Sequence, residues 1–174
     1  ARKVISLSAV ALGLPPATFD YHFSNPTAQF RCNHYPADAP GEDSGLRIGA
    51  HTDSSFFTLL PQRAGQARGL EVQQADGNWI SPAGLAGSFL VNTGKILKLW
   101  TRGAAKPTPH RVTRVTEDRI SLPLFLHPNW TSLIRPVSLP CFSPGEKATP
   151  SGLVEDDIDG ATEPLVRGGG SGTD

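Results

Sequence analysis

The sequence contains few cysteines, no methionine and no excess of charge of either sign. Its 2 cysteines are too few for a disulfide framework. Its 16 Lys and Arg balance 16 Asp and Glu, which excludes the basic surface expected of a nucleic-acid-binding protein. No apolar run approaches the roughly 20 residues of a membrane span, and the first residues lack a convincing secretory cleavage site. We therefore expect a cytoplasmic protein with reduced thiols and with neither nucleic acid nor membrane as a partner.

The missing methionine includes position 1, so we expect the sequence to be an internal or processed piece of a longer chain. The 174 residues suffice for one globular domain with a single core. The charged fraction of 18% lies below the ~25% typical of globular domains. The 18 glycines and 16 prolines favour a turn-rich β architecture over a helical bundle.

Apolar residues recur at helical spacing near the start of the sequence and predict an amphipathic helix over residues 3–14, which Pro15 and Pro16 end. From Gln29 onward, short apolar segments separated by turn residues predict antiparallel strands. The expected strands are 29–35, 46–51, 56–61, 70–73, 79–81, 88–92, 110–115 and 120–125. Asp76-Gly77 predicts a hairpin turn between the fourth and the fifth of them. Eight strands indicate a closed or double-sheet β domain.

The domain organisation that we expect has three parts. A helical lead-in covers residues 1–24, the mainly β domain covers residues 25–140, and a loosely ordered tail covers residues 141–174. The tail is rich in Gly, Pro, Ser and acidic residues, a composition that rarely packs into a core.

The residues most suggestive of chemistry are His51, Asp53 and the distant His110. Residues i and i+2 of a strand face the same side, so His51 and Asp53 are aimed together. A jelly roll could bring His110 opposite them. Two histidines and one carboxylate on one face of an octahedron leave three positions open, which is typical of non-haem Fe(II) sites that use O2. The alternative is a histidine that merely caps its neighbour.

A second pair of polar residues follows His110 at Arg119 and Ser121, which again share one face of a strand. An inward guanidinium needs an anion, and an arginine beside a hydroxyl suits a carboxylate. Asn33 and Tyr35, also at i and i+2, could supply an amide and a phenol to the same anion. The alternatives are a surface ion pair of Arg119 with Glu117 or Asp118, and ordinary strand packing for Asn33 and Tyr35.

Several motifs together give the sequence a family resemblance. They are, in order, Asn33-His34-Tyr35-Pro36, Gly49-Ala50-His51-Thr52-Asp53, Phe57-Thr58-Leu59-Leu60, Gly69-Leu70-Glu71-Val72, Gly87-Ser88-Phe89-Leu90-Val91-Asn92-Thr93-Gly94, His110-Arg111-Val112 and Arg119-Ile120-Ser121-Leu122-Pro123. In order and spacing the sequence resembles the catalytic part of the isopenicillin N synthase-like 2-oxoglutarate and Fe(II)-dependent oxygenases, over roughly residues 5–138.

This resemblance implies a double-stranded β-helix, or jelly roll, with an N-terminal helix. It implies that His51, Asp53 and His110 bind Fe(II), and that Arg119 and Ser121, with Tyr35 and Asn33, bind the distal carboxylate of 2-oxoglutarate. The implied reaction oxidises a C–H bond of a small organic substrate by hydroxylation, desaturation or cyclisation. It consumes O2 and releases succinate and CO2.

Two departures from the family pattern bear on these expectations. Lys95 stands where most relatives carry Asp, and the N-terminal portion that forms one wall of the substrate region has no counterpart here. Two other functions therefore stay open: an oxidase of the same fold that uses O2 without 2-oxoglutarate, and a truncated jelly roll that binds a ligand without catalysis. Zinc-dependent hydrolysis fits less well, because no spare carboxylate is spaced to act as a general base. The sequence specifies neither the substrate nor an oligomeric state.

Overall fold

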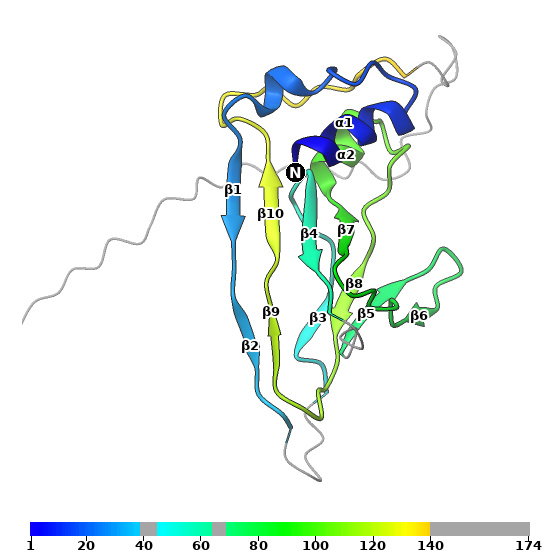
Figure 1. Ribbon diagram of the computed structural model, residues 1–174. Coiled ribbons are helices and arrows are strands. Elements are labelled where there is room, and N and C mark those ends of the chain that lie inside the picture. Colours follow the sequence, from blue (N-terminus) through cyan, green and yellow to red (C-terminus); the bar gives the residue numbers. More distant parts are fainter. Residues whose placement is uncertain (39–44, 64–68, 140–174) are drawn as a thin grey trace, which may run out of the picture.

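The computed structural model describes residues 1–38, 45–63 and 69–139. They form two four-stranded β-sheets and one two-stranded sheet, with helices at one end (Figure 1). The helices are α1 (Arg2–Ala11), the 3-10 helix η1 (Asp20–Phe23) and α2 (Lys95–Trp100). The strands are β1 (Thr27–Phe30), β2 (Asn33–Tyr35), β3 (Ile48–His51), β4 (Phe57–Pro61), β5 (Leu70–Gln73), β6 (Trp79–Ile80), β7 (Phe89–Thr93), β8 (His110–Val112), β9 (Arg119–Ser121) and β10 (Leu124–His127).

The first sheet has the strand order β1-β10-β4-β7, and all its pairs are antiparallel. Its two faces differ because side chains alternate along each strand. One face carries Phe57 and Leu126, which are buried in the main core. The other face carries Thr58 and Asn92, which line a cavity.

The strands β2 and β9 form a two-stranded extension of this sheet, shown in Figure 1 below β1 and β10. The register is continuous, because Phe30 pairs with Leu124 and Asn33 pairs with Ser121. The strands are interrupted at residues 31–32 and 122–123, where Pro123 has no N–H to give to the ladder. The sequence predicted single strands at 29–35 and 120–125, so each of those predictions covers two strands of the structure.

The second sheet has the strand order β3-β8-β5-β6. Its β5–β6 hairpin pairs Val72 with Ile80 and turns at Asp76-Gly77, as predicted. Gly77 has a φ of +89°, which glycine adopts without strain, and the Asp76 carboxylate accepts the Asn78 N–H at 3.0 Å. The two four-stranded sheets enclose one cavity between them, which confirms the mainly β jelly roll with an N-terminal helix.

The helix α1 covers the end of the first sheet. Its buried residues Ile5 and Ala9, four positions apart, share one face and belong to the same core cluster as Phe56 and Trp100. The helix ends at Ala11, and Gly13 follows with a left-handed φ of +72°, ahead of the prolines that were expected to end it. Nothing in the sequence analysis predicted α2.

No helix within residues 1–38, 45–63 and 69–139 is long and apolar enough to cross a membrane. The tail predicted at 141–174 and Cys141 lie outside the described residues, and Cys32 is exposed with a free thiol. The boundaries of the three predicted parts stay a prediction.

Candidate metal centre

Antiparallel pairing brings together two histidines that are far apart in the sequence. His51 is the last residue of β3 and His110 is the first residue of β8, and the two are direct partners in the β3–β8 pair. Their rings lie 4.3 Å apart between centroids. Asp53 follows His51 by two residues and is 7% exposed. Three residues that the sequence singled out therefore meet at one place.

The three side chains point one atom each at a common centre. The Nε2 atoms of His51 and His110 lie 3.9 and 3.6 Å from Oδ1 of Asp53. One ligand atom from each residue lies within 4.8 Å of the other two, which is close enough for one metal ion to contact all three. Two imidazoles and one carboxylate form the donor set typical of non-haem Fe(II) sites with open positions.

The Nδ1 atom of each imidazole ring forms a hydrogen bond with the backbone two residues earlier in the sequence. Nδ1 of His51 lies 2.8 Å from the carbonyl oxygen of Gly49, and Nδ1 of His110 lies 3.1 Å from that of Thr108. A carbonyl oxygen only accepts hydrogen bonds, so each Nδ1 must carry the proton and donate it. The tautomer thus leaves the Nε2 lone pairs free for a metal, as second-sphere partners commonly do.

The second carboxylate oxygen of Asp53 is held as well. Oδ2 accepts hydrogen bonds from the Thr58 hydroxyl at 2.6 Å and from the Asn92 amide at 2.9 Å. Since the Thr58 hydroxyl donates its hydrogen bond to Asp53, its oxygen accepts one from the buried Ser55 hydroxyl at 3.2 Å. Oδ1 is thereby left to face the histidines. The Asn92 amide also lies 3.5 Å from Nδ1 of His110, but the shorter contact to the Thr108 carbonyl decides that the nitrogen is a donor.

The sequence analysis assigned no role to Thr58 or Asn92. Both stood in the motifs that carried the family resemblance, and both lie at inward positions of their strands, where they are direct partners in the β4–β7 pair. A polar residue at an inward position of an otherwise apolar strand is the signal that could have identified them.

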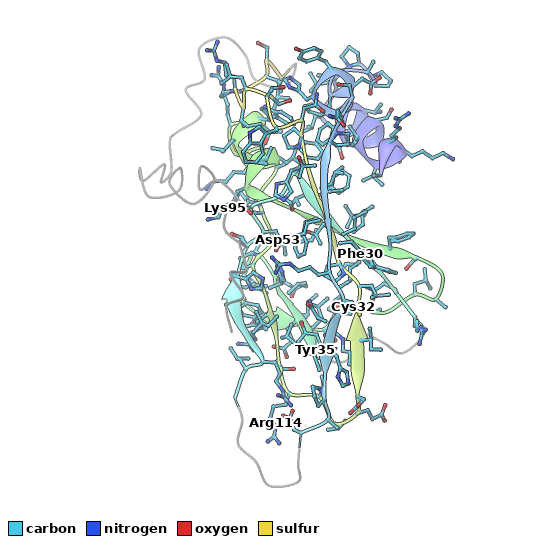
Figure 2. All side chains as sticks on the ribbon, turned by 90° about the vertical axis from the view of Figure 1, so that its left-hand side faces the viewer. Phe30, Cys32, Tyr35, Asp53, Lys95 and Arg114 are labelled. Carbon is cyan, nitrogen blue, oxygen red and sulfur yellow. The ribbon has the colours of Figure 1, made fainter. Side chains whose placement is uncertain are left out.

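The residues expected to bind a carboxylate also come together, along β2 and β9. Asn33 pairs with Ser121 and Tyr35 pairs with Arg119, and all four line the cavity. Arg119 is 8% exposed, and its Cζ lies 5.1 Å from the centroid of the Tyr35 ring. Figure 2 shows Tyr35 at a distance from Asp53 along the barrel, toward Arg114.

Arg119 lacks a counter-ion in the described part of the chain. Its Nη1 is buried and has no hydrogen-bond partner there. Burial lowers the pKa of Arg119, and the nearby Tyr35 opposes that effect. The acidic neighbour Asp118 bonds to the His34 ring at 3.0 Å instead, so the surface ion pair considered for Arg119 is not formed with it. A buried, unpaired guanidinium is costly, which indicates a site for an anion.

The cluster of His51, Asp53 and His110 lines the same cavity as Arg119, with a volume of about 230 Å³. It runs between the two sheets, and its remaining wall is mostly apolar: Ile48, Leu60, Leu70, Val72, Leu90, Val112 and Phe125. Apolar walls exclude water and strengthen electrostatic interactions inside the cavity. The cavity thus joins a cluster that could hold a metal ion to a buried guanidinium that could bind an anion.

Three other histidines lie outside this cluster. The ring centroids of His22 and Trp100 lie 4.9 Å apart, His34 forms a hydrogen bond with Asp118, and His127 lies on β10. Burial lowers the pKa of His127, and the negative charge of Asp53 opposes that effect. The sequence analysis expected all three histidines to serve packing or surface roles.

Comparisons with known proteins place this geometry in a family. A model of the 2OG-Fe(II) oxygenase superfamily matches residues 26–128. The chain is 34% identical to the 2-oxoglutarate-Fe(II) type oxidoreductase ppzC of Metarhizium rileyi, over 72% of this chain and 35% of that protein. It is 35% identical to homoarginine-6-hydroxylase 2-ODD-233 of Oryza sativa subsp. japonica, over 78% of this chain and 43% of that protein.

A solved structure gives the same result. The chain is similar to dioxygenase for auxin oxidation 1 from Arabidopsis thaliana in its binary complex with 2-oxoglutarate, with a TM-score of 0.67 and 26% identity over 78% of this chain and 50% of that one. The chain thus spans half or less of the length of these relatives. The family model nevertheless covers more than half of this chain, including all seven residues predicted for the site. The chain belongs to the 2OG-Fe(II) oxygenase superfamily.

Proposed function

We propose that this chain is the catalytic core of a non-haem Fe(II) and 2-oxoglutarate-dependent oxygenase that oxidises a C–H bond of a small organic substrate. The observation that supports this most strongly is the convergence of His51, Asp53 and His110, whose other polar atoms are all engaged. Structural metal sites usually have four protein ligands, whereas three ligands leave positions for small molecules.

In this proposal Nε2 of His51, Nε2 of His110 and Oδ1 of Asp53 hold Fe(II). When bound, the metal supplies the activation of O2, coupled to the conversion of 2-oxoglutarate into succinate and CO2 and to oxidation of the substrate. The contribution of the protein is orientation. Gly49 and Thr108 fix the imidazoles through their carbonyls, and Thr58 fixes the carboxylate.

The second part of the proposal concerns 2-oxoglutarate. Its distal carboxylate would lie against Arg119 and Ser121, with Tyr35 and Asn33 on the neighbouring strand. The unpaired Nη1 of Arg119 supports this assignment, because a carboxylate would supply the missing acceptor and neutralise the buried charge. The apolar wall of the cavity would keep water from the reacting atoms.

The prime substrate and O2 complete the set of proposed partners. The relatives include a homoarginine hydroxylase, and that name describes the relative alone. Hydroxylation, desaturation and cyclisation are all open for this chain. The cytoplasmic location expected from the sequence stays a prediction.

The test is an anaerobic titration with Fe(II) followed by 2-oxoglutarate, monitored through the visible charge-transfer band of the chelate. We expect the band in the unchanged chain and in His34→Ala, which alters an exposed histidine outside the cluster. We expect no band in His51→Ala. Iron binding without a 2-oxoglutarate band would favour the oxidase, and absence of iron binding would favour the non-catalytic jelly roll.

Arg119→Met tests the anchoring role separately. The variant should need at least about tenfold more 2-oxoglutarate to develop the band, because a charge-assisted pair is lost. Its metal-free form should unfold at a denaturant concentration no lower than that of the unchanged chain, because an unpaired buried charge is removed. An unchanged dependence on 2-oxoglutarate would contradict the assignment.

A further inference from the structure

The turn that carries Asp53 lies directly against the turn that begins α2. Three successive N–H groups of the second turn donate to three carbonyls of the first: Gly94 to Phe56 at 3.0 Å, Lys95 to Asp53 at 2.8 Å and Ile96 to Ser55 at 3.3 Å. The first N–H groups of a helix have no partner within the helix, and α2 has no side-chain cap. The Asp53 turn therefore serves as the cap of α2, and Figure 2 shows Lys95 beside Asp53.

Gly94 allows this close approach. It is buried, and a Cβ at this position would overlap the carbonyl oxygen of Ser55 and lie 2.6 Å from its carbonyl carbon. The backbone of Gly94 has φ −111° and ψ 179°, an extended conformation that any residue adopts. Glycine is thus required at position 94 for space and not for its conformational freedom.

The contact reaches the candidate metal ligand by two routes. Through the backbone, the Asp53 carbonyl is held by the Lys95 N–H. Through side chains, a Cβ on Gly94 would also lie 3.0 Å from the Ser55 hydroxyl, which bonds to Thr58, which in turn bonds to Oδ2 of Asp53. Displacing Ser55 would disturb both the backbone and the carboxylate of Asp53.

We propose that Gly94 is a positioning residue for the metal centre: its lack of a side chain seats the α2 turn on Ser55 and so fixes Oδ1 of Asp53 toward His51 and His110. This inference rests on the proposed function, because it assumes that those three residues bind Fe(II). Gly94 itself is not among the residues that line the cavity.

The same contact involves only the backbone of Lys95, the residue that departs from the family pattern. Lys95 contributes its backbone N–H to Asp53, and every residue except proline can supply that group. The departure from the family pattern at position 95 is therefore compatible with an intact Asp53 turn.

The test compares Gly94→Ala with Leu97→Ala in anaerobic titrations with Fe(II) alone. Leu97 lies on the same helix and is 4% exposed in the core, so its truncation destabilises the fold. Leu97 makes none of the three hydrogen bonds that join the two turns. Loss of a second-sphere partner typically weakens metal binding by roughly 10- to 100-fold. We expect a loss of this size in Gly94→Ala and less than about a twofold change in Leu97→Ala.

The outcomes separate the two proposals. If the unchanged chain binds no Fe(II), the proposed function fails. If the unchanged chain binds Fe(II) and Gly94→Ala binds it equally well, the positioning role of Gly94 is refuted while the proposed function stands. An equal loss in both variants would also refute it, because the effect would then follow general destabilisation.

A measurement on the unchanged chain covers the case in which Gly94→Ala does not fold. Metal binding and the contact between the two turns must stabilise each other reciprocally if they are coupled. Hydrogen exchange followed by NMR with diamagnetic Zn(II) should therefore slow at the Lys95 and Ile96 amides. The Gln74 amide, which bonds to Asn78 in the distant hairpin, should not change. Equal exchange at Lys95 and Ile96 with and without Zn(II) would contradict the proposal.

Discussion

At the scale of single residues, Asp53 shows how hydrogen bonds orient a candidate metal ligand. Its Oδ2 has two donors from a neighbouring strand pair, and its Oδ1 faces two imidazoles. A buried carboxylate without donors would be costly, so Thr58 and Asn92 both stabilise the charge and select which oxygen is exposed to the site.

Thr58→Val tests this preparation, because valine keeps the shape of threonine and removes the hydroxyl. Fe(II) affinity should fall by roughly 10- to 100-fold, measured by anaerobic titration. Thr101→Val is the matched control, since Thr101 is also buried but its hydroxyl donates to the Leu97 carbonyl of α2. Thr101→Val should leave the affinity unchanged, and an equal loss in both variants would show that the Thr58 hydroxyl has no special role.

We expect the stability of the chain to depend on pH through His22. Its ring packs on Trp100, and burial lowers its pKa below the ordinary value of 6.5. The unfolded chain therefore binds a proton at a higher pH than the folded chain does. His22 therefore does not lower the free energy of unfolding above pH 6.5, and it lowers this free energy increasingly as the pH falls from 6.5 toward the lowered pKa.

The check is urea unfolding of the metal-free chain at about pH 7.5 and about pH 5.5, on either side of the ordinary histidine pKa. The chain should be less stable at the lower pH, and His22→Gln should lose less stability between the two values. An equal loss in the two proteins would show that His22 does not contribute to the pH dependence.

At the scale of elements, α1 is held by one face alone. Ile5 is 3% exposed in the main core, whereas Leu7, two positions on, is 65% exposed. Ile5→Ala should lower the free energy of unfolding by about 2–5 kcal/mol, and Leu7→Ala should change it by less than about 0.5 kcal/mol. Chemical denaturation measures both. Similar small effects would mean that α1 does not pack as described.

The elements that the sequence analysis missed or merged have physical explanations. The helix α2 has only six residues, too few to stand out by periodicity, and it depends on the Asp53 turn and on the burial of Leu97 and Trp100. The predicted strands 29–35 and 120–125 are each divided in two, at residues 31–32 and 122–123. Pro123 lacks the N–H that a continuous ladder of hydrogen bonds would need at this point. Contacts between segments that are distant in the sequence determine both the formation of α2 and the division of these strands, so the local sequence alone does not predict either.

At the scale of the whole molecule, the grouping of the candidate site residues could be predicted because strand periodicity is local and the motifs are specific. Their roles as ligands of a metal and of a carboxylate stay a prediction. His51 with Asp53, and Arg119 with Ser121, each follow from residues i and i+2 on one face. For His51 and His110 the spacing only allowed a meeting across a jelly roll, since residues 52–109 lie between them in the sequence, and the family resemblance then implied it. The support from Thr58, Asn92 and Gly94 depends on distances between strands and turns, which spacing along the sequence does not specify.

The central claim is that two imidazoles and one carboxylate of this chain bind one Fe(II). X-ray absorption spectroscopy of the iron-loaded chain under anaerobic conditions measures it most directly. The account predicts one iron per chain with the multiple-scattering signature of two imidazoles, reduced to one imidazole in His110→Ala. A spectrum of the unchanged chain with no imidazole, or one that is identical in His110→Ala, would contradict the account.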